Sequence, residues 1–201
     1  MHRLRGGEPV AVDAGADTTG KLLVATPLIG DGNFEQTVVL MLAHQEEGSA
    51  GVVLNRPSGM LVSDALPHWA PYLAPPPTMF IGGPVSNESV VALARVREDP
   101  NEGWWTPVLG LVGTLDLEAD PEEVASAVDA VRLFAGYAGW SPGQLEDEID
   151  SGAWFVVDAD PADLLTESPG DLWPAVLARQ PSPLSRGGIH IGRGRRRGLG
   201  R

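Results

Sequence analysis

The chain has 201 residues, which is enough for one domain with its own hydrophobic core, so no disulfide or metal is needed to hold it together. It contains no cysteine, and this excludes disulfides, thiolate metal sites and a cysteine nucleophile. The formal net charge is −13, and no run of about eighteen apolar residues predicts a membrane span.

The two ends of the chain differ in composition from the rest. Residues 1–19 lack a continuous apolar stretch of signal-peptide length, so they predict a disordered leader on a cytoplasmic protein. Residues 186–201 hold six arginines and no acid, and all 27 acidic residues precede them. Because an acidic body repels nucleic-acid phosphates, only this Gly/Arg-rich tail offers a nucleic-acid contact. We expect a disordered, solvated tail rather than a dedicated nucleic-acid arm.

The first part of the chain predicts strands. Three apolar runs lie between turn-forming or polar segments, at residues 21–27, 37–43 and 50–54. Because their apolar residues are consecutive rather than alternating, both faces of these strands should be covered. Further strands are predicted at residues 79–81, 89–96 and 107–117, with a short helix at 61–66 and an irregular proline-rich segment at 71–77.

The second part of the chain predicts helices. Asp120 offers an N-cap and Pro121 a first helical residue, ahead of a periodic apolar run, which predicts a helix from 120 to about 134. Ser141 and Gln144 form a capping-box pattern before a second helix at 145–149. A strand at 154–157, a short helix opened by residues 160–161 and a last helix at 172–179 complete the prediction.

Four segments carry distinctive patterns: residues 22–34 (LLVATPLIGDGNF), 44–57 (HQEEGSAGVVLNRP), 81–85 (IGGPV) and 134–154 (FAGYAGWSPGQLEDEIDSGAW). Together, and in this order, they resemble the YqgE/AlgH family. The resemblance implies one α+β domain, residues 20–185, with a strongly bent, partly barrel-like β-sheet surrounded by helices. It also implies a bacterial cytosolic protein of unsettled biochemical role. The AlgH name carries a proposed link to transcriptional regulation, to which the acidic body lends no electrostatic support.

Trp140 and Gln144 are the first candidate site residues. Small residues surround Tyr137 and Trp140 directly before the capped helix, so the simplest interpretation is structural: the glycines allow close turns and Trp140 fills a core position. The alternative is a small-anion site at the N-terminus of that helix, where free N–H groups favour negative charge. We prefer the structural interpretation.

His44 is the second candidate. A catalytic zinc usually has three protein ligands, which one histidine with Glu46 and Glu47 does not supply, so no metal and no cofactor is predicted. As a general base His44 would need a positioned nucleophile, and no Gly-x-Ser-x-Gly pattern is present. A hydrogen-bonded loop histidine is the preferred interpretation.

Arg56 is one of few basic residues in the acidic part of the chain, and two interpretations stay open. It could pair with Glu146 or Glu148 and hold its loop to the later helix. It could instead anchor a pocket for a carboxylate or phosphate ligand, with Asn55 and the Gly82-Gly83 backbone beside it.

These residues favour a non-enzymatic module that binds a protein or a small anionic ligand and has a regulatory role. A hydrolase-like enzyme using His44 and Arg56 is the alternative, and a DNA-binding regulator would depend on the tail alone. An enzyme should bring His44, Arg56 and an acid into one cleft, whereas a binding module should leave them apart and hydrogen-bonded. The oligomeric state is left open.

Overall fold

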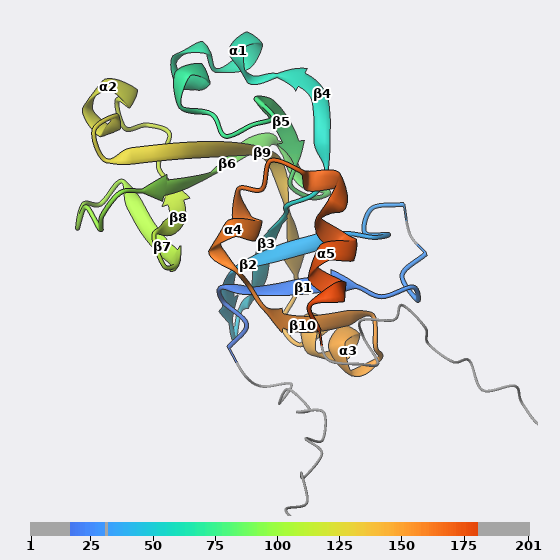
Figure 1. Cartoon of the computed structure of the whole chain (residues 1–201). Helices are drawn as coiled ribbons and strands as arrows, with labels where there is room; N and C mark the ends of the chain where they lie inside the picture. The colour runs from blue at the N-terminus through green and yellow to red at the C-terminus, as the bar shows by residue number, and fades with distance from the viewer. Residues whose placement is uncertain (1–16, 31, 181–201) are drawn as a thin grey trace, which may run out of the picture.

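The computed structural model describes residues 17–30 and 32–180, and strands dominate it (Figure 1). The strands are β1 Lys21–Ala25, β2 Val38–Gln45, β3 Gly48–Val53, β4 Pro57–Leu61, β5 Thr78–Ile81, β6 Val85–Val96, β7 Trp105–Leu109, β8 Val112–Leu115, β9 Val128–Trp140 and β10 Trp154–Asp158. The helices are α1 Val62–Ala65, α2 Pro121–Val124, α3 Gln144–Asp150, α4 Pro161–Leu164 and α5 Leu172–Ala178, with 3-10 helices η1 Pro67–Tyr72 and η2 Pro169–Asp171.

One open sheet runs in the order β10-β1-β2-β3-β9-β6-β8-β7, with β5 beside β9 and β4 beside β5. Every pairing is antiparallel except that of β5 with β9. The α+β class is therefore confirmed in outline, but the expectation that helices surround the sheet is wrong for the described chain. The sheet does not close into a barrel, because β10 and β7 lie at opposite ends of its path. The helices are also few and short, at most seven residues each.

The long strand β9 joins the two halves of the sheet. Its first part pairs with β6, and its last residues pair with β3, where Trp140 lies opposite Ser49. Between these parts Gly136 has a φ of 68°, a conformation that favours glycine. In Figure 1 the first part of β9 lies along β6 and its second part descends beside β3. The expected bend of the sheet is thus located at this strand.

Three buried clusters make up the core, and β9 contributes to all of them. Leu22 and Leu40 enter the cluster beneath α4 and α5, whereas their neighbours Leu23 and Val39 enter the cluster beneath α3. Successive residues of these strands therefore point into different clusters, as strand geometry requires. This confirms the prediction that both faces of the early strands are covered. The third cluster lies beneath α1, η1 and α2.

The predicted helix from 120 to 134 is wrong beyond its first turn. Asp120 does cap α2, since its side chain accepts the Glu122 N–H at 2.9 Å, but this helix ends at Val124. From Val128 onward the chain belongs to β9, with Val131 and Leu133 on one face and Ala130 and Phe134 on the other. As a strand of the sheet this run buries one face in each of two clusters, which outweighs its weak helical preference.

Other predictions need smaller changes. The predicted strand at 107–117 is two strands, β7 and β8, which turn at Gly110 with a φ of 56°. The predicted early strands, β10, and the short helices α1, α4 and α5 are confirmed to within a few residues. Within the described residues, no helix is long and apolar enough to cross a membrane.

Most of the predicted leader and the whole tail, residues 1–16 and 181–201, lie outside the described residues. Asp17, Thr18 and Thr19, which the sequence assigned to the leader, are described. Thr18 is only 3% exposed, because it packs against β2. Contacts of the fold therefore extend a few residues before β1.

Candidate functional site

Asn55 and Arg56 follow β3 and hold the loop that connects β1 to β2. The Asn55 side chain accepts the Val38 N–H at 3.0 Å and donates to the Gln36 carbonyl at 2.9 Å. With both ends of its amide used, Asn55 sets the position of the chain entering β2. This is a structural task for a residue that the sequence suggested as a ligand contact.

Arg56 clamps the same loop. Its Nη1 donates to the Gly32 carbonyl at 2.9 Å and its Nη2 to the Glu35 carbonyl at 3.1 Å. The suggested ion pair with Glu146 or Glu148 is wrong, because in the described chain those carboxylates bind other groups. Arg56 is partly buried, and two of its donors are committed to the loop.

Arg56→Ala should lower the free energy of unfolding by about 1–2 kcal/mol, since it removes two charge-assisted hydrogen bonds from a partly exposed position. Urea denaturation measures this. Arg97→Ala is the control, because Arg97 donates to a single carbonyl, that of Ser126, away from this loop. Equal effects of the two substitutions would argue against the clamp.

The clamped loop carries Phe34 to an aromatic cluster. The Phe34 carbonyl accepts the Thr37 hydroxyl at 2.8 Å, which ties the loop to the start of β2. The Phe34 ring stacks on Trp140 with centroids 6.5 Å apart and meets Trp154 edge-on at 5.6 Å. The two tryptophans also meet edge-on, at 6.1 Å. Three segments distant in sequence thus form one aromatic wall.

Glu148 on α3 organises this wall. Its Oε2 accepts the indole N–H of Trp140 at 2.9 Å and that of Trp154 at 2.8 Å, and its Oε1 accepts the Gln144 amide at 2.9 Å. Gln144 in turn accepts the Ser141 N–H at 3.0 Å, so half of the expected capping box is present, while α3 itself begins after Gly143. A carboxylate has about four lone-pair sites, so Oε1 retains acceptor capacity.

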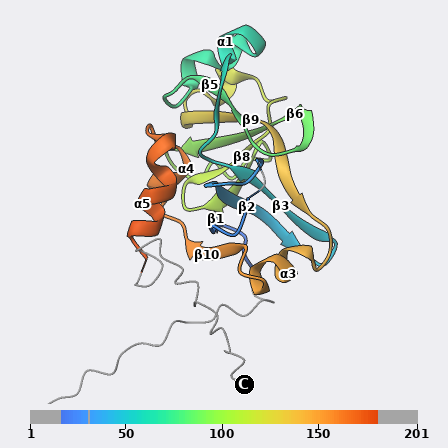
Figure 2. The same cartoon turned by 90° about the vertical axis from the view of Figure 1, so that its right-hand side faces the viewer.

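A groove of about 400 Å³ opens over these side chains. Its lining residues are Ile29, Gly30, Phe34, Pro84, Gly139, Trp140, Gln144, Glu148, Ala153 and Trp154. Three of the four segments that carry the family resemblance line it directly, and the fourth contributes the Asn55 and Arg56 clamp. Figure 2 shows α3 at the foot of β3 and β9, two of the elements that supply lining residues. Among the described lining residues the only formal charge is the Glu148 carboxylate, so the lining does not match the anion that the sequence suggested.

His44 lies in β2 rather than in a loop, and its two ring nitrogens have partners. Nδ1 is 2.8 Å from the Thr18 hydroxyl and Nε2 is 2.8 Å from Glu146 Oε1. A backbone hydrogen bond at Glu146, and then His44, hold the pKa of the Glu146 carboxyl below its ordinary value. His44 and Glu146 line a second hollow of about 410 Å³ with Asp17, Gln45, Glu46 and Gly143.

The site residues predicted from the sequence therefore lie in different parts of the structure. Trp140 and Gln144 line the groove, Arg56 and Asn55 hold one of its walls, and His44 faces a separate hollow. No cluster of three His, Asp or Glu side chains able to hold a metal ion occurs in residues 17–30 and 32–180.

Gly82 and Gly83 follow β5 and are buried against the backbone of β9, and they do not form a ligand cradle. The Gly82 N–H donates to the Ala135 carbonyl at 2.8 Å, and its carbonyl accepts the Val53 N–H at 2.9 Å. A side chain at either glycine would overlap the backbone of β9. Their contribution to the groove is indirect, through Pro84, which follows them and lines it.

Sequence reasoning missed Phe34, Glu148 and Trp154 as members of the site, and it also missed Arg132. Glu148 lies four residues after Gln144, a spacing that places both on one face of a helix and could have indicated their contact. Arg132 falls within the predicted helix from 120 to about 134, where a charged residue is ordinary, whereas a single arginine inside an apolar strand would have stood out.

A family model described as AlgH-like matches residues 22–185. UPF0301 proteins of Streptomyces avermitilis and Mycobacterium tuberculosis are 50% and 47% identical to the chain, over 83% of its length and over 89% and 84% of theirs. A crystal structure of a protein from Corynebacterium diphtheriae superposes with a TM-score of 0.82 at 36% identity, covering 88% of this chain and 94% of that one. The solution structure of the AlgH protein from Pseudomonas aeruginosa gives a TM-score of 0.61 at 29% identity, covering 88% and 92%. The chain therefore belongs to the AlgH-like family, which its four segments resemble.

Proposed function

We propose that the protein is a non-enzymatic binding module and that the groove at Trp140, Trp154 and Glu148 receives the cationic group of a small ligand. The observation that carries the proposal is the Glu148 carboxylate, held by two indole N–H groups at the point where the four segments meet. A regulatory role is part of the proposal, with ligand occupancy controlling the binding of a partner.

The chemistry of the groove supports a cation. Ammonium and guanidinium groups are attracted to the faces of aromatic rings, most strongly to tryptophan, and an adjacent carboxylate adds to the attraction. The acidic body concentrates cations near its surface. A volume of about 400 Å³ lies within the usual range of small-molecule sites. An anion would meet the Glu148 charge without a basic partner among the described lining residues.

The hydrolase-like alternative has less support. His44 and Arg56 contact different segments, and their polar atoms are used by Thr18 and Glu146 in one case and by loop carbonyls in the other. This dispersed and satisfied arrangement is the one expected of a binding module. Direct DNA binding would rest on residues 186–201, which lie outside the described residues.

The proposal is tested by titrating the labelled protein with choline and agmatine while the indole N–H signals are followed by NMR. We expect saturable shifts centred on Trp140 and Trp154, and none with acetate. Glu148→Gln should weaken binding about tenfold, equivalent to about 1.4 kcal/mol, because it removes the charge and keeps the shape. Asp147→Asn, an exposed acid of the same helix outside the groove, is the matched control.

Two results would contradict this function. One is the absence of saturable shifts at Trp140 and Trp154 with either cation. The other is equal weakening by Glu148→Gln and Asp147→Asn, which would mean that the acidic surface in general, and not the groove, attracts the probes.

A further inference from the structure

Arg132 is an unusual residue for the middle of a strand, because its side chain is buried and charged. It lies on β9 and is only 2% exposed. Its neighbours along the same face, Ala130 and Phe134, belong to the cluster beneath α4 and α5. The Arg132 Cζ lies 4.4 Å from the centroid of the Phe80 ring, which supplies a cation–π contact.

The hydrogen bonding of Arg132 is incomplete within the described residues. Its Nη2 donates to the Pro75 carbonyl at 2.5 Å, whereas its buried Nε and Nη1 have no hydrogen-bond partner there. Burial lowers the pKa of Arg132 to about 10, and the Glu167 carboxylate opposes this change, so the group is cationic at neutral pH. A buried cation with unpaired donors is costly, and natural proteins supply such a group with an acceptor.

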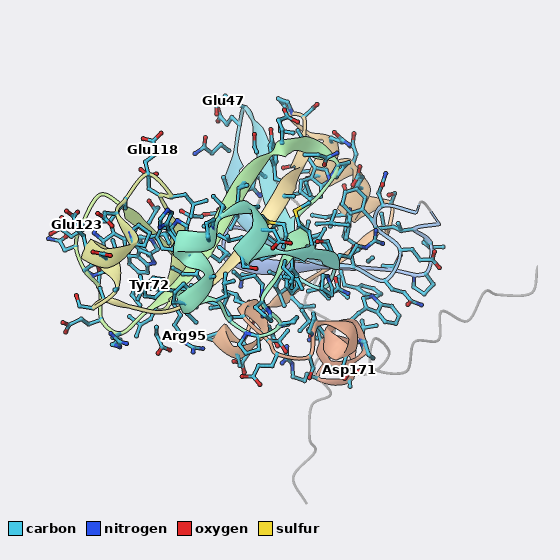
Figure 3. All side chains as sticks on the ribbon, turned by 90° about the horizontal axis from the view of Figure 1, so that it is seen from above. Glu47, Tyr72, Arg95, Glu118, Glu123 and Asp171 are labelled. Atoms are coloured by element: carbon cyan, nitrogen blue, oxygen red, sulfur yellow. The ribbon has the colours of Figure 1, made fainter. Side chains whose placement is uncertain are left out.

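The Pro75 segment, whose carbonyl Arg132 holds, forms part of the wall of a hollow of about 400 Å³. Its lining residues are Leu73, Ala74, Pro75, Arg95, Asp129, Ala130, Ala162, Leu165, Thr166 and Glu167. Pro75, whose carbonyl Arg132 holds, and Glu167, whose charge acts on Arg132, are both part of this wall. Figure 3 labels Arg95 at the edge of the molecule, beside the C-terminal helices.

Of the two cations described near the hollow, only Arg95 has a carboxylate paired with it. Arg95 is paired with Asp129, with its Nε 2.7 Å from Oδ2. Within the described chain Arg132 has no such ion pair, and the Glu167 side chain is exposed. The Thr166 hydroxyl accepts the Ser168 N–H at 3.2 Å and still has its own proton to donate.

We propose that this hollow is a site for a small oxyanion, a phosphate or carboxylate group, with Arg132 as its buried cation. Nε–H and Nη1–H are the donors left for such a group. They point to opposite sides of the Nε–Cζ bond, because Nη1 lies cis to Cδ, so the anion accepts from Nε–H on one side of the guanidinium. Arg132 does not itself line the hollow, so binding includes a small displacement of Pro75 or of the Glu167 side chain. The bound anion then takes the place of the Glu167 carboxylate as the negative charge nearest to Arg132.

The first test is thermal unfolding of the full chain in chloride buffer with added inorganic phosphate or acetate at constant ionic strength. We expect a saturable rise of the midpoint, roughly 5 °C or more at a hundredfold excess of anion over its dissociation constant. The anion whose effect on the midpoint saturates at the lower concentration identifies the ligand class, phosphate or carboxylate. General salt stabilisation is distinguishable because it grows with concentration without saturating.

The second test uses variants and a direct signal. The Arg132 Nε–H resonance should shift as the same anion binds. Arg132→Met should abolish the saturable response and, in chloride buffer, unfold at the same or a higher temperature, because it removes an unpaired buried charge. Arg97→Met is the control, since Arg97 lies outside the hollow. Glu167→Gln, an exposed and foldable change, should tighten anion binding severalfold.

Several outcomes would overturn the proposal. An unchanged anion response in Arg132→Met would place any bound anion elsewhere. A lower midpoint in Glu167→Gln, together with no saturable response of the native protein, would identify Glu167 as the counter-charge of Arg132. An Nε–H resonance that moves with neither phosphate nor acetate would show that neither anion binds at Arg132.

Discussion

Gly83→Ala should lower the free energy of unfolding by roughly 3 kcal/mol or more, the sum expected for overpacking and for a strained backbone. An added Cβ would lie 2.2 Å from the Tyr137 carbonyl carbon and 2.3 Å from the Ala138 nitrogen, both of them backbone atoms of β9. Backbone cannot rotate aside as a side chain does, so the close approach of Gly83 to β9 must open. For a domain of this size the melting midpoint should fall by about 10 °C.

Gly59→Ala is the control for this substitution. Gly59 lies in β4, and no atom lies within 4 Å of the position that its Cβ would take. Its effect should stay within about 0.5 kcal/mol. Urea denaturation of the two variants decides the matter, since similar stabilities would mean that the contact between Gly83 and β9 is looser than the structure describes.

Glu148→Leu should lower the free energy of unfolding by roughly 2–5 kcal/mol, because each buried donor left without a partner costs about 1–3 kcal/mol. Trp140 and Trp154 are 6% and 4% exposed, and both indole N–H groups donate to this single carboxylate. Asp147→Leu, on the exposed face of the same helix, should change stability by less than about 0.5 kcal/mol.

A double-mutant cycle separates the lost hydrogen bonds from the altered helix. Trp140→Phe should destabilise the native protein more than it destabilises Glu148→Leu, where its N–H already lacks a partner. Additive effects would show that the carboxylate and the indole are not coupled. The same cycle run on cation binding distinguishes a structural role of Glu148 from its proposed contact with the ligand.

Local patterns predicted those parts of the fold that local interactions determine. The runs that became β1, β2 and β3 lie between turn-forming or polar segments, and α4 begins at the predicted Asp160, whose side chain accepts the Ala162 N–H at 2.9 Å. The start of α2 was predicted for the same reason. Its continuation was not, because Ala130 pairs with Arg95, a partner far away in the sequence.

The candidate site likewise combines residues that local patterns predict with residues that only long-range strand pairing brings together. Trp140 and Gln144 could be singled out because they surround a recognisable capping pattern. Phe34 and Trp154 could not, because they reach Trp140 only through the pairings of β1 with β10 and of β3 with β9. Arg56 was noticed for its charge, but its carbonyl partners depend on a loop conformation that no residue pattern specifies.

The pairing of β1 with β10 bears on how the protein is made. Lys21 and Asp158, which face each other across these strands, are 137 residues apart in the chain. At about 5–20 residues per second, a ribosome needs roughly 7–27 seconds to deliver the second strand after the first. Throughout that interval the backbone edge of β1 that pairs with β10 is free in the nascent chain, and the apolar faces of β1 to β3 are not fully covered. The elements that cover them, β9, α3, β10 and α5, all come later in the sequence. Protection by chaperones is therefore most valuable to this protein before its last quarter has been translated.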